Sequence, residues 1–213
     1  MPLYKTITVS KDITAYLWKV TESEEQLSHG IALTDHCQKR LDAMKSTMHR
    51  RAFLSIRHLL RQEGYEDRDL YYNEFGKPHL VDGNHISITH SNEFTAIIVS
   101  RNELVGIDIE KQRDKILRIA HKFTPIQEYR TLANSEAVMR KLTIVWGAKE
   151  SLYKIYAQPG LSFLNHIDVK DFPFDAKTTT ATISYEGKKS TYAVDFFEFE
   201  GFTCVFARSS NGG

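Results

Sequence analysis

The sequence is poor in cysteine, in long apolar runs and in surplus charge. Its two cysteines, Cys37 and Cys204, lie far apart and lack the spacing of metal ligands, which predicts free thiols in a reducing compartment. No stretch approaches the roughly 18 apolar residues of a membrane span, and the N-terminus has no apolar run of signal-peptide type, so we expect a cytoplasmic chain without membrane contact. Lysine and arginine total 28 against 27 aspartates and glutamates, so a general nucleic-acid binder is not expected.

The spacing of apolar residues predicts an α+β chain of two lobes. Residues 40–62 and 135–156 carry apolar side chains at intervals of three and four, which is typical of amphipathic helices. Each half of the chain runs strand, helices and then three or more strands. We therefore expect two pseudo-symmetric α/β lobes, at 1–103 and 104–208, each with a long helix packed on a small, mainly antiparallel sheet, and a flexible tail at 209–213.

Shorter elements are predicted from β-branched and aromatic runs and from turn residues. The expected strands are 13–20, 70–73, 85–91, 95–100, 103–110, 166–169, 178–185, 191–197 and 202–207, and short helices are expected within 22–38, 114–123 and 125–132. Because the strands between residues 85 and 110 follow one another closely, we expect them to form an antiparallel meander.

The third strand of that meander carries two carboxylates. Successive side chains of a strand point to opposite faces, so Asp108 and Glu110 share one face while Ile107 and Ile109 share the other. At about 6 Å and an effective dielectric of about 20, the two charges repel by roughly 3 kcal/mol. A hard divalent cation such as Mg²⁺ would offset this repulsion, whereas a charged outer face of an edge strand is the alternative. Gly106 lets another backbone or a ligand come close.

Both long helices also present charge. In the first, Arg50, Arg57 and Arg61 fall within about 40° of one another, and Arg51 and His58 flank them. This stripe is either a solvated face or a phosphate clamp, since guanidinium suits phosphate oxygens. The apolar stripe of the second helix comprises Val138, Leu142, Val145, Ala148, Leu152 and Tyr156. We expect that stripe to pack on a sheet and to leave Glu150, about 140° away, facing outward.

Four motifs together carry a resemblance to a known family. They are Gly76-Lys77-Pro78, Ser87-Ile88-Thr89-His90-Ser91, Gly106-Ile107-Asp108-Ile109-Glu110 and Trp146-Gly147-Ala148-Lys149-Glu150-Ser151-Leu152-Tyr153-Lys154. In this order and spacing they resemble the 4′-phosphopantetheinyl transferase superfamily, in its surfactin-synthetase-activating form with two lobes in one chain. Phe123 and Glu128 also fit the family's F-x-x-x-x-E segment. Thr89 and Gly147 depart from the usual serine and small hydroxyl residue.

The resemblance implies an enzyme that transfers 4′-phosphopantetheine from coenzyme A to a serine of an apo acyl or peptidyl carrier protein, releasing adenosine 3′,5′-bisphosphate. It implies Mg²⁺ held by Asp108, Glu110 and Glu150. The implied catalytic residues are Glu150, Lys154 and Asp108, with Glu150 either a metal ligand or the general base. The implied coenzyme-binding residues are Lys77, Pro78, Thr89 and His90 at the 3′-phosphoadenosine end, Lys149 at the phosphates, and Arg51 or Arg57.

Because one chain carries both lobes and one site, the resemblance also implies a monomer. A non-catalytic paralogue that binds coenzyme A or a carrier protein is the main alternative. A Mg²⁺-dependent nucleotide hydrolase or phosphotransferase of another fold is a further alternative, and the lack of a G-x-x-x-x-G-K-[ST] loop counts against the common kind.

Overall fold

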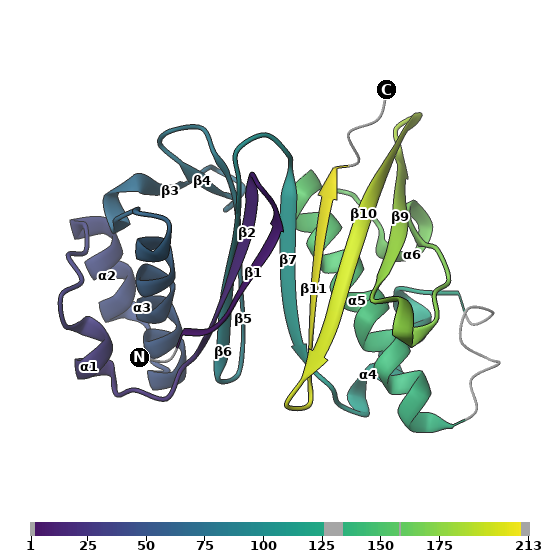
Figure 1. Ribbon diagram of the computed structural model, residues 1–213, viewed down its shortest axis with the longest axis horizontal. Coiled ribbons are helices and arrows are strands. Elements are labelled where there is room, and N and C mark those ends of the chain that lie inside the picture. Colours follow the sequence, from purple (N-terminus) through teal and green to yellow (C-terminus); the bar gives the residue numbers. More distant parts are fainter. Residues whose placement is uncertain (1–2, 126–133, 158, 210–213) are drawn as a thin grey trace. The chain divides into compact units, whose positions relative to one another are not determined.

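The computed structural model describes residues 3–125, 134–157 and 159–209, which divide into two compact units (Figure 1). The first unit ends at Asn102 and the second begins at Glu103. Each unit contains one long helix and an antiparallel sheet, so the prediction of an α+β fold is confirmed. The two sheets differ in strand number and order, and the pseudo-symmetry of the lobes stays a prediction. The described helices include none with the length and apolar character that a membrane crossing requires.

The first unit is built on a four-stranded sheet in the order β1-β2-β6-β5. Its strands are β1 (Leu3–Ser10), β2 (Ile13–Lys19), β5 (His85–Ser91) and β6 (Phe94–Ser100), with a separate hairpin of β3 (Leu70–Tyr72) and β4 (Pro78–Leu80). Its helices are α1 (Glu24–Ser28), α2 (Asp35–Ala43), α3 (Thr47–Gln62) and the 3₁₀ turn η1 (Asp67–Asp69). Helix α3 packs on β2 and β6, and its apolar face forms the core with them.

The predicted helix at 40–62 is wrong at its start. Helix α2 ends at Ala43, and α3 begins only at Thr47. Met44 has an extended backbone, with φ −77° and ψ 119°, and the side chain of Ser46 then accepts a hydrogen bond from the backbone N–H of His49 as the N-cap of α3. Serine favours this position because its side chain competes for backbone donors. Strand β1 was not predicted at all.

The second unit contains a five-stranded antiparallel sheet in the order β7-β11-β10-β9-β8. Its strands are β7 (Val105–Lys111), β8 (Ile167–Val169), β9 (Thr178–Tyr185), β10 (Lys188–Phe199) and β11 (Phe202–Ser209). Its helices are α4 (Lys115–Ile119), α5 (Ser135–Tyr156) and α6 (Phe163–His166), with 3₁₀ turns η2 (Ala120–Lys122) and η4 (Phe174–Ala176). The predicted helix at 125–132 falls almost wholly outside the described residues. Of the predicted tail, Ser209 ends β11 and residues 210–213 lie outside them.

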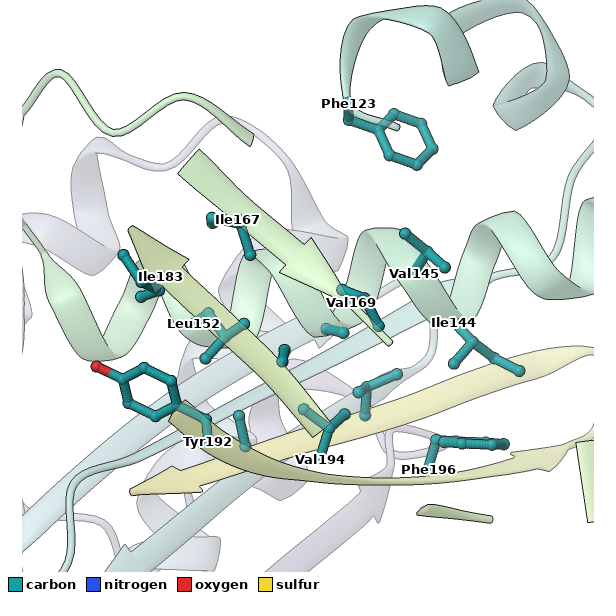
Figure 2. Packing of buried hydrophobic residues seen from close by; sticks show 14 of the residues in the cluster. Phe123, Ile144, Val145, Leu152, Ile167, Val169, Ile183, Tyr192, Val194 and Phe196 are labelled. Carbon is teal, nitrogen blue, oxygen red and sulfur yellow. The ribbon is translucent and has the colours of Figure 1, made fainter. Parts of the chain in front are cut away.

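Helix α5 packs along β7 and β11 and supplies one side of the core. Leu142, Val145, Ala148 and Leu152 are buried there, as the predicted stripe requires. Figure 2 shows Val145 and Leu152 of α5 among the apolar side chains that β8, β9 and β10 contribute. The stripe therefore fixes which face of α5 meets the sheet.

The predicted meander is wrong, because β7 does not continue the sheet of β5 and β6. Strand β6 lies between β2 and β5, so both of its hydrogen-bonding edges are occupied within the first unit. Strand β7 instead pairs with β11, with Asp108 opposite Val205. The strand that carries the carboxylates therefore belongs to the second unit and pairs with a strand from the end of the chain.

Candidate active site

Strand β7 presents its two carboxylates on one face, as the alternation of the sequence predicts. Asp108 is 6% exposed and Glu110 is half-buried, while Ile107 and Ile109 on the other face are buried. The alternative of a charged, solvated outer face does not apply to Asp108, because its carboxylate lies inside the protein. A buried carboxylate needs a cation or hydrogen-bond donors to remain ionised.

Helix α5 approaches β7 most closely at Gly106. A Cβ at this position would stand 2.0 Å from the carbonyl oxygen of Ser151, so the role predicted for Gly106 in a close backbone approach is confirmed. The approach brings Lys154 to the carboxylates. Its Nζ donates to Oδ1 of Asp108 at 2.8 Å and to the carbonyl oxygen of Ile107 at 2.7 Å.

Three carboxylates of the second unit interact electrostatically. Burial, together with the negative charges of Asp108 and Glu150, raises the pKa of Glu110 to about 7 against the opposing effects of the Trp146 indole N–H and of Lys154. Burial, followed by the charge of Asp108, also raises the pKa of Glu150. Burial and the mutual repulsion of the carboxylates thus both disfavour the ionised forms of Glu110 and Glu150 in the absence of a cation.

The donor set fits a hard cation, although the side chains do not converge on one point. Across residues 3–125, 134–157 and 159–209, no three histidine, cysteine, aspartate or glutamate side chains are placed so as to hold a common ion. Oδ1 of Asp108 faces Lys154, and Oε1 of Glu110 accepts the indole N–H of Trp146 at 3.2 Å. Carboxylate oxygens are nevertheless the ligands that Mg²⁺ prefers, and the raised pKa values of Glu110 and Glu150 mark a place where a cation would be favourable.

The first unit holds a pocket of about 290 Å³ that is lined by three of the predicted coenzyme-binding residues, Arg57, Thr89 and His90. Its lining residues are Arg40, Met44, His49, Ala52, Phe53, Ile56, Arg57, Tyr72, Ile88, Thr89 and His90. Thr89 and His90 come from β5, as the motif predicts, and the ring of His90 lies 5.8 Å from that of His49. The guanidinium of Arg40 lies 4.8 Å from the ring centre of Tyr72.

Sequence reasoning missed Arg40 and His49. They lie on either side of the break between α2 and α3, which the helical periodicity conceals. Ser46 is the signal that could have revealed the break, because serine before a helical run is a common N-cap.

Lys77 and Pro78 belong to the turn that joins β3 to β4. The backbone N–H of Lys77 donates to Oδ1 of Asn73 at 2.9 Å, and Pro78 begins β4. Burial lowers the pKa of Lys77, and the charge of Lys77 contributes, after burial, to a lowered pKa of His85. The turn thus holds Lys77 half-buried and close enough to the His85 imidazole to affect its charge.

Comparison with known proteins agrees with the motifs. Residues 104–207 match the 4′-phosphopantetheinyl transferase superfamily. The second unit belongs to this superfamily. The 4′-phosphopantetheinyl transferase gsp of Aneurinibacillus migulanus is 31% identical over 135 residues, which are 62% of this chain and 54% of that relative. The chain therefore aligns with about half the length of its relative. The family predicted from the four motifs is confirmed.

Lys149, a residue of the superfamily's W-x-x-K-E motif, does not face the carboxylates with its ammonium. It is 1% exposed, and its Nζ donates to the carbonyl oxygens of Phe123 at 2.5 Å and Phe163 at 2.8 Å. The resemblance to the superfamily linked Lys149 to phosphates. In the structure its charge joins three segments of the second unit, and the phosphate role of Lys149 stays a prediction.

The arginines of α3 likewise have partners within the first unit. Arg57 is 2% exposed and pairs with Asp67 at 2.8 Å, and Arg51 donates to the carbonyl oxygen of Val20 at 3.0 Å. The other members of the stripe pair as follows: Arg50 with Glu24, Arg61 with the carbonyl oxygen of Gly30, and His58 with the carbonyl oxygen of Leu27. Each of these side chains therefore has a partner within the first unit, although Arg61 remains exposed, and the phosphate clamp stays a prediction.

The superfamily's F-x-x-x-x-E segment is described only in part. Phe123 is buried, and its ring lies 5.0 Å from that of Trp146 in an edge-to-face arrangement. Glu128 lies outside the described residues.

Proposed function

We propose that this protein transfers 4′-phosphopantetheine from coenzyme A to a serine hydroxyl of an apo carrier protein. The observation that carries the proposal is the cluster of Asp108, Glu110 and Glu150 with Lys154 beside it, in the unit that matches the superfamily. A protein that only bound coenzyme A would gain nothing from three interacting carboxylates in one place.

The reaction forms a bond between the serine oxygen and the phosphorus that bears pantetheine, and it breaks the pyrophosphate bond. Adenosine 3′,5′-bisphosphate leaves with the electron pair of that bond. Asp108, Glu110 and Glu150 would hold Mg²⁺, which when bound supplies positive charge against the pyrophosphate oxygens.

The remaining steps belong to side chains of the second unit. Where Glu150 is the general base rather than a ligand of Mg²⁺, it accepts the serine proton, directly or through a water molecule, and burial, which raises its pKa, makes it a better base near neutral pH. Lys154, fixed by Asp108 and by the carbonyl oxygen of Ile107, supplies a positive charge for the transferring phosphate.

The pocket of the first unit suits the 3′-phosphoadenosine end of coenzyme A. Phe53 and Tyr72 provide aromatic surface for a base, and His49, His90 and Arg40 provide donors for a phosphate. We assign the 3′-phosphate to these three residues and to Thr89. Arg57 is left out because Asp67 neutralises it, and Lys149 because its ammonium is buried among main-chain carbonyls.

Intact-mass spectrometry of an apo carrier protein tests the proposal. The carrier is incubated with this protein, coenzyme A and Mg²⁺, beside a reaction that contains EDTA. We expect one phosphopantetheine on the carrier serine, and none with the chelator. Unchanged mass on several carriers, together with coenzyme A binding detected by calorimetry, would identify a non-catalytic binder.

A further inference from the structure

The ammonium of Lys149 and the ring of Trp146 both contact Phe123 and Phe163. Lys149 Nζ binds the main-chain carbonyl oxygens of Phe123 and Phe163. The ring of Trp146 lies 5.0 Å from the ring of Phe123 and 5.4 Å from the ring of Phe163. Trp146 and Lys149 are three residues apart on α5 and so lie on neighbouring turns of one face.

These contacts fix to α5 two segments that are distant in sequence, one at Phe123 and one at Phe163. Phe123 follows η2, and Phe163 begins α6, so neither is anchored to α5 by the regular hydrogen bonds of a helix or sheet. Lys149 provides that anchor through two charge-assisted hydrogen bonds in a buried environment, where such bonds are strong. The indole of Trp146 is then confined by a ring of each segment.

The confined indole reaches the carboxylate cluster. Trp146 Nε1 donates to Oε1 of Glu110 at 3.2 Å. This hydrogen bond favours the ionised form of Glu110 and fixes the orientation of one of its oxygens. A change in the position of the indole would therefore change the placement of Glu110.

We propose that Lys149 is a positioning residue, which holds Trp146 between Phe123 and Phe163 and through it orients Glu110 for the cation. The inference rests on the proposed function for its metal but makes a separate claim about this chain. Partners that orient a metal ligand typically change metal affinity by about 10-fold or more when they are removed.

The test uses Lys149→Met with Lys141→Met as the matched control, both in a Trp18→Phe background that leaves Trp146 as the one tryptophan. Lys141 is also a buried lysine of α5, but its Nζ binds Asp171 and the carbonyl oxygen of Phe172. The measurements are the emission spectrum of Trp146 and the affinity for Mg²⁺ by calorimetry, with thermal unfolding as a check on stability.

We expect Lys149→Met to shift Trp146 emission to longer wavelength and to weaken Mg²⁺ binding by about 10-fold. Lys141→Met is expected to lower the melting temperature while leaving both properties at their background values. Unchanged emission and Mg²⁺ affinity in Lys149→Met would overturn the positioning role, and so would equal changes in both variants. A parent protein that binds no Mg²⁺ would instead overturn the metal assignment of the proposed function.

A second variant covers the case in which Lys149→Met does not fold. Phe163→Leu removes one ring from Trp146 but keeps the carbonyl oxygen that accepts from Lys149. The same red shift and the same direction of change in Mg²⁺ affinity are expected. A folded Phe163→Leu protein with background emission and affinity would show that the indole is not held in this way.

Discussion

Arg57 carries its positive charge in the interior of the first unit. Its Nε donates to Oδ1 of Asp67, its guanidinium lies 3.5 Å from the ring centre of Phe53, and one N–H points to Cys37. Burial opposes ionisation of Asp67, but the N–H of Thr34 and the charge of Arg57 together lower its pKa. The pair is thus a cross-link between α3 and the segments around it, although the same arginine borders the pocket.

We predict that Arg57→Met lowers the free energy of unfolding by about 3–5 kcal/mol, because it leaves Asp67 buried without its cation. Urea denaturation of the whole chain measures this loss. The double change Arg57→Met with Asp67→Leu is the control, and it should be less destabilising than the single one, since no unpaired charge remains. A stable Arg57→Met protein that binds coenzyme A more weakly would assign Arg57 to the phosphates instead.

Glu110 gives the metal-free protein a definite pH dependence. Its pKa is about 7 in the folded protein against an ordinary value of 4.5, so the folded protein retains a proton that the unfolded chain has released. The contribution of Glu110 to the free energy of unfolding therefore falls as the pH rises from about 4.5 to about 7.

The variant Glu110→Gln removes this titration. We predict that the free energy of unfolding of Glu110→Gln, minus that of the wild type, increases between pH 5 and pH 7.5 in the presence of EDTA. Urea denaturation at the two pH values measures the difference. A difference that does not change with pH would contradict the buried, charge-rich environment of Glu110.

Residue-level prediction from the sequence succeeds where strand alternation or a motif fixes the side chain. The shared face of Asp108 and Glu110 follows from the two-residue period of a strand. The burial of Arg57 and Lys149 and their hydrogen-bond partners could not be predicted from a pattern. Helical periodicity gives the angle of a side chain but not the segments that cover it. Both lysines of the W-x-x-K-E-x-x-x-K motif carry the same charge, and only their neighbours separate Lys149 from Lys154.

At the scale of elements, the contact between β7 and α5 leaves no room for a side chain at Gly106. The atoms that a Cβ would meet are the main-chain carbonyl carbon and oxygen of Ser151, which cannot move without moving α5. At Gly147 the nearest atom is instead Cγ2 of Val205, at 2.7 Å, which belongs to a side chain. Gly106 therefore permits the close contact of β7 with the backbone of α5, whereas Gly147 permits the close contact of α5 with a side chain of β11.

We predict that Gly106→Ala lowers the free energy of unfolding by about 3 kcal/mol or more, because overpacking against a backbone cannot be relieved by a rotamer change. Gly147→Ala is the matched control. Its overpacking is offset by the gain of about 1 kcal/mol that alanine brings to a helix interior, so a clearly smaller loss is expected. Chemical denaturation measures both, and equal losses would contradict the backbone contact at Gly106.

The elements themselves were predictable where a period extends over a whole helix or strand. Helix α5 and strands β5 and β9 have the bounds that the sequence predicts. The break at Met44 to Ser46 was not predicted, because apolar spacing continues from Leu41 to Met48 even though Met48 is 49% exposed. Strand β1 was missed because half of its residues are exposed and none is buried, and such a strand lacks a clear apolar alternation.

At the scale of the whole molecule, sheet membership could not be obtained from sequence order. The short connection between β6 and β7 suggested neighbouring strands, but hydrogen bonds from β2 and β5 occupy both edges of β6. The partner of β7 is β11, almost 100 residues later in the chain. Long-range pairings of this kind depend on the complete set of competing edges, which no local pattern contains.

The assignment of the active site to the cluster of Asp108, Glu110 and Glu150 is tested by comparing the wild type with Asp108→Asn. Each protein is incubated with one apo carrier protein, coenzyme A and Mg²⁺, and the carrier is followed over time by intact-mass spectrometry. Asparagine keeps the shape of the side chain that contacts Lys154 but removes the charge of the cluster's most buried carboxylate. We predict that the wild type adds one phosphopantetheine and that a folded Asp108→Asn protein does so at least about 100-fold more slowly. Transfer by Asp108→Asn at the wild-type rate would contradict the assignment of the active site to this cluster.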